Sequence, residues 1–167
     1  MRSILTEKHF SYVSEKDRAF LIAFDKEILD LGYARMEIGD FDRWGNYTVA
    51  YAKPNVKART YLSKIFFDGT TISLRLYFRN IDRHVKYIED APNHIKEAFI
   101  NDDGKCGHCQ VNGCVNLNGS CSHRKIYIVD GITYEKCDGK VFYFHNFDIE
   151  NLNDYISIIK RFYPVKK

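Results

Sequence analysis

Three of the four Asp-Gly dipeptides of this sequence constrain the fold more than any other feature. They stand at residues 68–69, 130–131 and 138–139, and each lies between runs of alternating apolar and polar residues. Asp-Gly favours the two-residue turn whose twist matches that of a pair of antiparallel strands. The sequence therefore predicts one antiparallel hairpin in the middle of the chain and a three-stranded meander in its C-terminal part.

A two-residue turn also determines which residues face each other across a hairpin. The first turn predicts that Ile65 faces Ile72, and the second predicts that Arg124 faces Cys137. Because side chains alternate along a strand, the central hairpin then has one apolar face and one face of mixed character. The apolar face is expected to lie against the core of the protein.

Helix signals lie on both sides of these strands. Ser14 is a capping residue for a first helix that Gly32 ends, and Pro92 divides a helical region at about residues 82–100. Asp148 caps a closing helix. The first helix and the closing helix carry apolar stripes at helical spacing: Phe20, Phe24, Ile28 and Leu31, and Ile149, Leu152, Ile156, Ile159 and Phe162.

The composition is that of a globular protein. The chain has 167 residues, of which 45% are hydrophobic and 28% charged, so it is long enough to bury a core. We therefore expect a single α+β domain over residues 1–167. Its antiparallel sheet is packed by three to four helices, and a C-terminal β-meander with a cysteine-rich loop precedes the closing helix.

All five cysteines fall between residues 106 and 137, within a segment over residues 101–140 that we interpret as metal-binding. The Cys-Gly-His-Cys knuckle lets two thiolates point at one ion, and zinc favours four such ligands in a tetrahedron. The loop between Cys114 and Cys121 contains Gly119 and can bend either way, so Cys114 is an alternative to Cys121. The ligands we expect for a structural zinc ion are Cys106, Cys109, Cys121 and Cys137.

The N-terminal residues lack the apolar region of a signal peptide, and no apolar run has the length of a membrane span. We therefore expect a cytosolic protein with no membrane partner. Thiols in the cytosol are mostly reduced, which favours a metal site over disulfides. The odd number of five cysteines also fits disulfide pairing poorly, because one would be left over. Free cysteines in a loop and a hairpin are the plain alternative.

A redox function is a second alternative. The tetrapeptide Cys106-Gly-His-Cys109 resembles the active site of protein disulfide isomerases, a family in which this motif opens a helix whose dipole lowers the pKa of the first thiol. The flanking residues here show no helical pattern. Thiol-disulfide exchange, or oxidation of metal-bound thiolates in a redox-responsive protein, is therefore kept as an alternative.

Nucleic acid is a minor alternative partner. The cysteines have basic and aromatic neighbours, but nearby acids offset their charge, and 25 basic against 22 acidic residues give a net charge of only +3. The paired CxxC knuckles of a standard zinc ribbon are absent. The basic residues in question are Lys105, His123, Arg124, Lys125, Lys136 and Lys140.

The mixed face of the central hairpin is the best candidate for a binding surface, and an ordinary solvated face is the other interpretation. Its residues suit an anionic or aromatic ligand. The sequence has no phosphate-binding glycine loop, nucleophile elbow or HExxH motif, so we assign no catalytic residue and lean against an enzyme. We expect a binding module for a small molecule or a partner protein, with candidate ligand-binding residues Lys64, Arg75, Tyr77 and Arg79.

From Ile72 onward the order of features resembles that of small uncharacterised bacterial proteins of unknown function. These features are a Leu-Arg-Leu-Tyr-Phe strand, a helix pair, the Cys-Gly-His-Cys knuckle, a hairpin and a closing helix, over about residues 72–163. The resemblance implies a CxxC, Cys and Cys pattern, from which Cys114 departs. It implies no activity. The residues that correspond to the pattern are Cys106, Cys109, Cys121 and Cys137.

Overall fold

A computed structural model describes most of the chain. The described residues are 11–38, 47–54, 61–67, 71–105, 123–138, 141–145 and 147–165. The chain groups into two compact units, of which the first is Met1–Phe78 with Tyr143–Lys167 and the second is Arg79–Phe142. The expected single domain over residues 1–167 stays a prediction.

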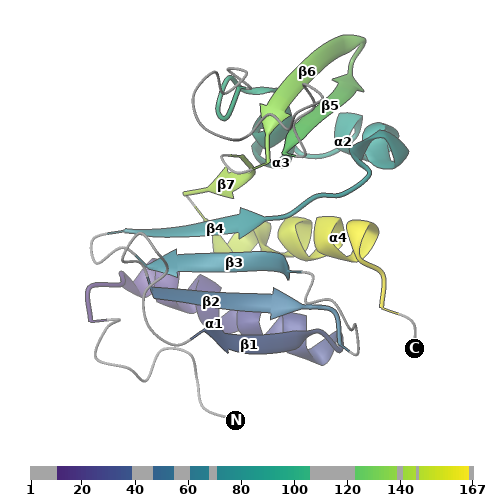
Figure 1. Ribbon diagram of the computed structural model, residues 1–167. Helices are drawn as coiled ribbons and strands as arrows, with labels where there is room; N and C mark the ends of the chain where they lie inside the picture. The colour runs from purple at the N-terminus through teal and green to yellow at the C-terminus, as the bar shows by residue number, and fades with distance from the viewer. Residues whose placement is uncertain are drawn as a thin grey trace, which may run out of the picture. The chain divides into compact units, whose positions relative to one another are not determined.

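The first unit contains an antiparallel sheet with the strand order β1-β2-β3-β4-β7 (Figure 1). Every neighbouring pair of strands runs antiparallel. The strands are β1 (Ala34–Ile38), β2 (Tyr47–Ala52), β3 (Tyr61–Phe67), β4 (Ile72–Leu76) and β7 (Tyr143–Phe144).

The register of the central hairpin differs from the prediction by two residues. Ile65 faces Leu74, and the last residue of β3, Phe67, faces Ile72. The prediction that Ile65 faces Ile72 is therefore wrong, because the connection holds residues 68–71 rather than a two-residue turn. A shift by an even number of residues leaves every side chain on its predicted face.

The strand after the second hairpin has a different partner from the one we expected. We placed it beside β6 (Ile132–Cys137), but β7 pairs with β4, with Arg75 opposite Tyr143. The backbone of Phe142 has φ +63°, a left-handed conformation that is rare for a residue other than glycine. This local change of direction separates β7 from the preceding hairpin.

Helix α1 (Glu15–Asp30) begins and ends as predicted. The Ser14 Oγ accepts a hydrogen bond from the backbone N–H of Asp17 over 3.1 Å, which caps the first turn. Gly32, with φ +86°, ends the helix in the left-handed conformation that glycine adopts without strain. The predicted stripe is buried at Phe20, Phe24 and Ile28.

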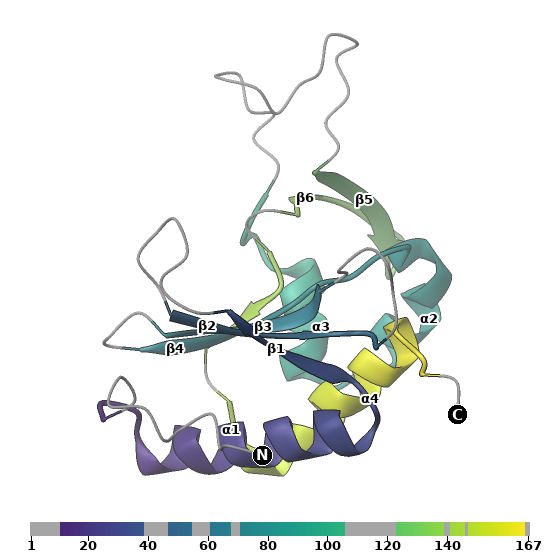
Figure 2. The same cartoon turned by 60° about the horizontal axis from the view of Figure 1, so that its bottom comes forward.

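Helix α4 (Leu152–Phe162) follows a short 3-10 helix, Ile149–Asn151, and Asp148 caps this segment by accepting from the Glu150 N–H over 3.1 Å. Helices α1 and α4 lie along the same face of the sheet (Figure 2). Ring contacts join the layers, with centroids 5.6 Å apart for Phe24 and Tyr51 and 5.2 Å apart for Phe144 and Tyr155. Residues of the closing stripe are buried at Ile156 and Ile159.

The second unit joins two short helices to a hairpin. Its helical segments are a 3-10 helix, Ile81–His84, then α2 (Val85–Glu89) and α3 (Asn93–Ile100), and the hairpin consists of β5 (Arg124–Val129) and β6. The predicted register is confirmed, with Arg124 opposite Cys137. Asp130 and Gly131 have φ +49° and +76°, as the predicted turn requires. The buried Tyr127 hydroxyl donates to the carbonyl of Phe99 over 2.7 Å.

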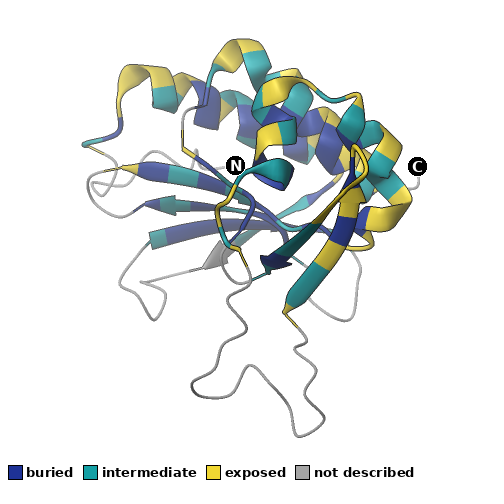
Figure 3. Cartoon of the chain, turned by 90° about the horizontal axis from the view of Figure 1, so that it is seen from above, coloured by how far each residue is buried: buried dark blue, intermediate teal, exposed yellow. Residues whose placement is uncertain are grey.

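The predicted α+β class is confirmed. The described residues contain four α-helices, a five-stranded antiparallel sheet and a two-stranded sheet. Buried and exposed residues alternate along the helices, as amphipathic packing requires (Figure 3). Every helix in the described part of the chain is too short or too polar to cross a membrane.

Candidate functional site

Three of the four predicted ligand-binding residues come together on the sheet face that is turned away from α1 and α4. Lys64 in β3 lies directly opposite Arg75 in β4. The guanidinium carbon of Arg75 lies 4.5 Å from the ring centroid of Tyr77. Arg79 is exposed and belongs to the second unit, so we do not count it in this face.

Two further tyrosines hold the cations of this face. The Lys64 Nζ lies 4.4 Å from the ring centroid of Tyr61, and the Arg75 guanidinium carbon lies 5.0 Å from that of Tyr143. A cation over an aromatic face is attracted by the negative charge of the ring. Each cation of this face is thus oriented by at least one ring.

The rings form a row across the edge of the sheet. The centroids of Phe66 and Tyr143 lie 5.7 Å apart, and the rings of Tyr143 and His145 are stacked at 6.2 Å with an angle of 7° between their planes. Sequence analysis missed Tyr143 and His145 because it placed their strand beside β6. We call the following residues the aromatic face: Tyr61, Lys64, Phe66, Arg75, Tyr77, Tyr143 and His145.

The charge of the aromatic face is positive. Lys64 and Arg75 are like charges in direct opposition, an arrangement that destabilises a sheet. Among the described strand positions of this face, none is an aspartate or a glutamate.

The opposite face of the sheet is held to α1 by a buried ion pair. Arg35 donates to the Asp25 carboxylate over 3.0 Å, and their side chains are 7% and 13% exposed. The Tyr51 hydroxyl also donates to this carboxylate, over 2.9 Å. Burial, together with the nearby carboxylate, raises the pKa of Tyr51 well above its ordinary value, so this hydroxyl stays protonated. The network keeps β1, β2 and α1 in fixed register beneath the aromatic face.

The predicted zinc ligands lie mostly outside the described residues. Cys106, Cys109, Cys114 and Cys121 fall there, and Cys137 is half-buried near the end of β6 without a disulfide partner among the residues described. The described residues contain no group of three or more His, Cys, Asp or Glu side chains placed to hold a metal ion.

The backbone around Cys137 is bonded to residues on either side of the stretch 106–122. On one side its backbone N–H donates to the carbonyl of Gly104 over 2.8 Å, and Lys105 forms an antiparallel bridge with Lys136. On the other side the Asp138 N–H donates to the carbonyl of His123 over 2.7 Å. Lys105 and His123, the described residues on either side of the stretch 106–122, therefore both lie beside the same end of β6.

Lys136 secures one of these two sides. Its side chain is buried, and its ammonium group donates to the Asn101 carbonyl, the Asn101 Oδ1 and the Asp103 carbonyl over 2.5, 2.6 and 2.9 Å. Burial lowers the pKa of Lys136, and the nearby Asp103 opposes this effect. Lys136 is thus an internal cation that holds Asn101 and Asp103 beside β6.

Other cations near the cysteines are also paired with protein groups. Lys125 lies 3.6 Å from Asp138, and Lys105 lies 3.0 Å from Asp102. The Arg124 guanidinium pairs with Glu135. Of the basic residues named for the nucleic-acid alternative, four are thus paired with protein groups or buried, His123 is exposed, and Lys140 lies outside the described residues.

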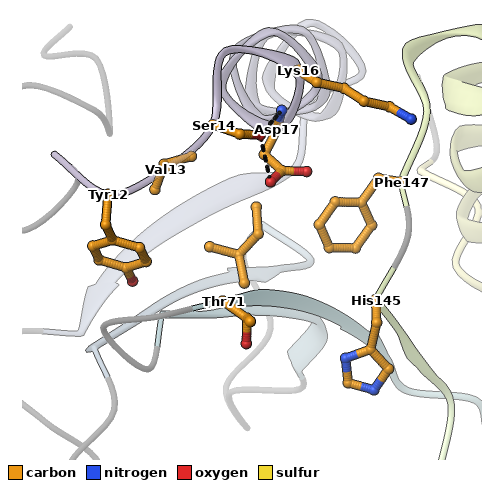
Figure 4. Close-up of a pocket in the computed structure, with 9 residues that line it drawn as sticks. Tyr12, Val13, Ser14, Lys16, Asp17, Thr71, His145 and Phe147 are labelled. Atoms are coloured by element: carbon orange, nitrogen blue, oxygen red, sulfur yellow. Dashed lines mark hydrogen bonds between the residues drawn. The ribbon is translucent and has the colours of Figure 1, made fainter.

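A pocket of about 350 Å³ lies at the N-terminal end of α1 (Figure 4). Its size is at the lower end for a small-molecule site. Its charged groups are engaged, because the Asp17 carboxylate accepts from the Ser14 hydroxyl over 2.8 Å and Lys16 pairs with Asp148 over 2.9 Å. This hydrogen-bonded pair raises the pKa of Lys16 and lowers that of Asp148. The exposed His145 links the pocket lining to the aromatic face.

Comparison of the chain with protein-family models, with curated proteins and with solved structures gave no match.

Proposed function

We propose that the protein is a non-catalytic binding module, and that its aromatic face recognises an anionic group attached to an aromatic ring. The observation that carries this proposal is the direct opposition of Lys64 and Arg75 across β3 and β4. Two cations held side by side offer charge-assisted hydrogen bonds to one phosphate or carboxylate. The ligand would replace their mutual repulsion with two attractive contacts.

The rings of the same face support the aromatic part of the ligand. Tyr143 contacts Phe66, with 43° between the ring planes, and His145, with 7°, so an aromatic surface continues beyond the cations. Aromatic rings stack favourably in offset geometry. Helices α1 and α4 pack against the opposite face of the strands that carry these residues. Sites on such regular elements are well preorganised.

We further propose a structural zinc ion held by Cys106, Cys109, Cys121 and Cys137, with Cys114 as the alternative to Cys121. The position of Cys137 between the two ends of the stretch 106–122 supports this set. In sequence, Cys106 directly follows Lys105, and Cys121 precedes His123 by two residues. A closed four-cysteine site has no open coordination position, so it would stabilise structure rather than activate water. Such a site needs reduced thiolates, which the cytosol maintains, so we propose that the protein is cytoplasmic.

The binding proposal is tested by calorimetric titration of the full chain with phenyl phosphate and with inorganic phosphate. Phenyl phosphate is expected to bind more tightly, because only it can stack. Lys64→Gln and Arg75→Gln are each expected to weaken its binding about tenfold or more, the effect of losing a charge-assisted hydrogen bond. The matched control is Lys26→Gln, an exposed lysine on α1 that pairs with Asp30. No binding of either probe, or binding that neither substitution weakens, contradicts the proposal.

A further inference from the structure

The pocket at the start of α1 has an apolar floor. Its volume of about 350 Å³ is within the range of cavities that hold small molecules. Three of its lining residues, Val13, Ile72 and Phe147, are buried and apolar. The ring of Phe147 is held in place by stacking on Phe20, with centroids 5.0 Å apart. The described lining residues all belong to the first unit. A small apolar group therefore fits against this floor.

Asp17 supplies the pocket with a carboxylate that has one oxygen available to a ligand. Its Oδ2 accepts from the Ser14 hydroxyl over 2.8 Å, and the Ser14 Oγ accepts from the Asp17 backbone N–H over 3.1 Å. Figure 4 shows the other carboxylate oxygen pointing toward the side of the pocket where Phe147 lies. Within the described residues, this Oδ1 atom has neither a hydrogen bond nor an ion pair. Because Ser14 is neutral, its hydroxyl orients the carboxylate and leaves the negative charge in place.

The cation on the rim of the pocket is committed to another acid. The Lys16 ammonium pairs with Asp148 over 2.9 Å. Asp148 is also the main cause of the raised pKa of Lys16, to which Asp17 adds only a smaller effect. An anionic ligand in the pocket would be repelled by Asp17 and would compete with Asp148 for Lys16. An ammonium group would instead form a charge-assisted hydrogen bond with the Asp17 carboxylate.

From these observations we propose that the pocket binds a small organic ammonium ion. The Asp17 Oδ1 accepts a hydrogen bond from the ammonium group, and Val13, Ile72 and Phe147 contact its apolar part. Such a site goes beyond the proposed function, because these four residues are not part of the aromatic face and the ligand has the opposite charge.

The test is calorimetric titration of the full chain at neutral pH with 2-phenylethylamine, 2-phenylethanol and 3-phenylpropionate. The three probes share a ring on a short chain and differ in charge, since a primary amine is an ammonium ion at this pH. The amine is expected to bind about tenfold or more tightly than the alcohol, because only the amine makes a charge-assisted hydrogen bond. The carboxylate should bind more weakly than the alcohol, because Asp17 repels it.

A pair of variants tests the role of the Asp17 charge. Asp17→Asn keeps an oxygen that can accept from the Ser14 hydroxyl and removes the charge, so it should bind the amine about as weakly as the wild type binds the alcohol. The matched control is Glu15→Gln, which removes the other carboxylate from the first turn of α1 at a residue outside the pocket lining. This control should bind the amine as the wild type does. Circular dichroism confirms that both variants are folded.

Backbone amide chemical shifts of the wild type locate the bound amine without a variant. The largest changes are expected at Val13, Asp17, Ile72 and Phe147. The inference is overturned if the amine does not bind, if the amine and the alcohol bind equally, or if 3-phenylpropionate binds more tightly than the amine. Shift changes that leave those four residues unaffected, or equal effects of Asp17→Asn and Glu15→Gln, also overturn it.

Discussion

Lys64 and Arg75 are direct cross-strand partners, so two positive side chains stand opposite each other on one face of a five-stranded sheet. A sheet selected for stability alone would place opposite charges there. Each cation lies over at least one aromatic ring. Tyr61 belongs to β3, Tyr77 directly follows β4, and Tyr143 belongs to β7.

A double-mutant cycle with Lys64→Gln and Arg75→Gln measures this opposition. We expect the coupling between the two side chains to destabilise the folded protein by about 0.2–1 kcal/mol at low salt, because like charges repel across a strand pair. The cycle cancels the loss of cation–ring contacts, which each single variant also suffers. Urea unfolding at low and at about 1 M salt is the measurement, and screening should remove most of the coupling. A favourable coupling would show that the pair is not under repulsion.

Ser63 is expected to be replaceable with a gain in stability. Its side chain is fully buried on the helix side of β3, and within the described part of the chain its hydroxyl oxygen has no hydrogen-bond partner. A buried hydroxyl without a partner costs about 1–3 kcal/mol. Ser63→Ala should therefore raise the free energy of unfolding by about 1 kcal/mol. Ser73→Ala, at a half-exposed position in β4, is the control and should change little; a loss of stability in Ser63→Ala contradicts the prediction.

Lys136→Met should destabilise the second unit by about 1–3 kcal/mol, because the Asn101 and Asp103 oxygens lose their buried donor. The control is Lys105→Met, a neighbouring exposed lysine that pairs only at the surface with Asp102. Urea unfolding compares the two variants with the wild type. Equal effects of the two substitutions would show that the buried ammonium has no special role.

The same variant has a pH signature. Burial lowers the pKa of Lys136 below its ordinary value of 10.5. Between that lowered pKa and 10.5, the unfolded chain still binds a proton that the folded protein has lost, so this group makes the folded state more stable as pH rises. The stability of the wild type relative to Lys136→Met should therefore increase as pH approaches 10.5 from below. A constant difference between the two proteins across this range contradicts the stated direction of the pKa.

The zinc proposal predicts about one zinc ion per chain in protein purified without added metal. Cys137→Ser and Cys121→Ser should lose the metal, and Cys114→Ser should keep it. If Cys114 is the third ligand, the last two results exchange. Elemental analysis and the melting temperature with and without chelator are the measurements. A metal-free wild type with unchanged melting in chelator refutes the site, and a reversible disulfide in that protein would favour the redox alternative.

Local signals in the sequence were sufficient for most of the elements. The cap at Ser14, the glycine that ends α1 and the Asp130-Gly131 turn were each predicted, and each has the expected geometry. The register of β5 against β6 followed from that turn alone. These features depend on a few adjacent residues, so they can be predicted without knowledge of the tertiary structure.

The features that the sequence could not supply depend on contacts between distant residues. The partner of β7 is β4, some seventy positions away, and no local rule selects it, so Tyr143 and His145 were missed as part of the site. The connection from Phe67 to Ile72 is longer than its Asp-Gly dipeptide suggests. From the sequence alone, Lys136 is expected to be a surface cation. In the structure it is buried, because acceptors in residues 101–103 bind its ammonium group. Three of the four candidate ligand-binding residues nevertheless share one face of the sheet, as predicted, because an even register shift preserves the faces of a strand.

The most direct test of the binding proposal is a map of backbone amide chemical shifts during titration with phenyl phosphate. The account predicts that the largest changes fall in β3, β4 and β7, around Lys64, Arg75 and Tyr143. Changes confined to the pocket at the start of α1, or to the hairpin that carries Cys137, with the amides of those three strands unaffected, would contradict it.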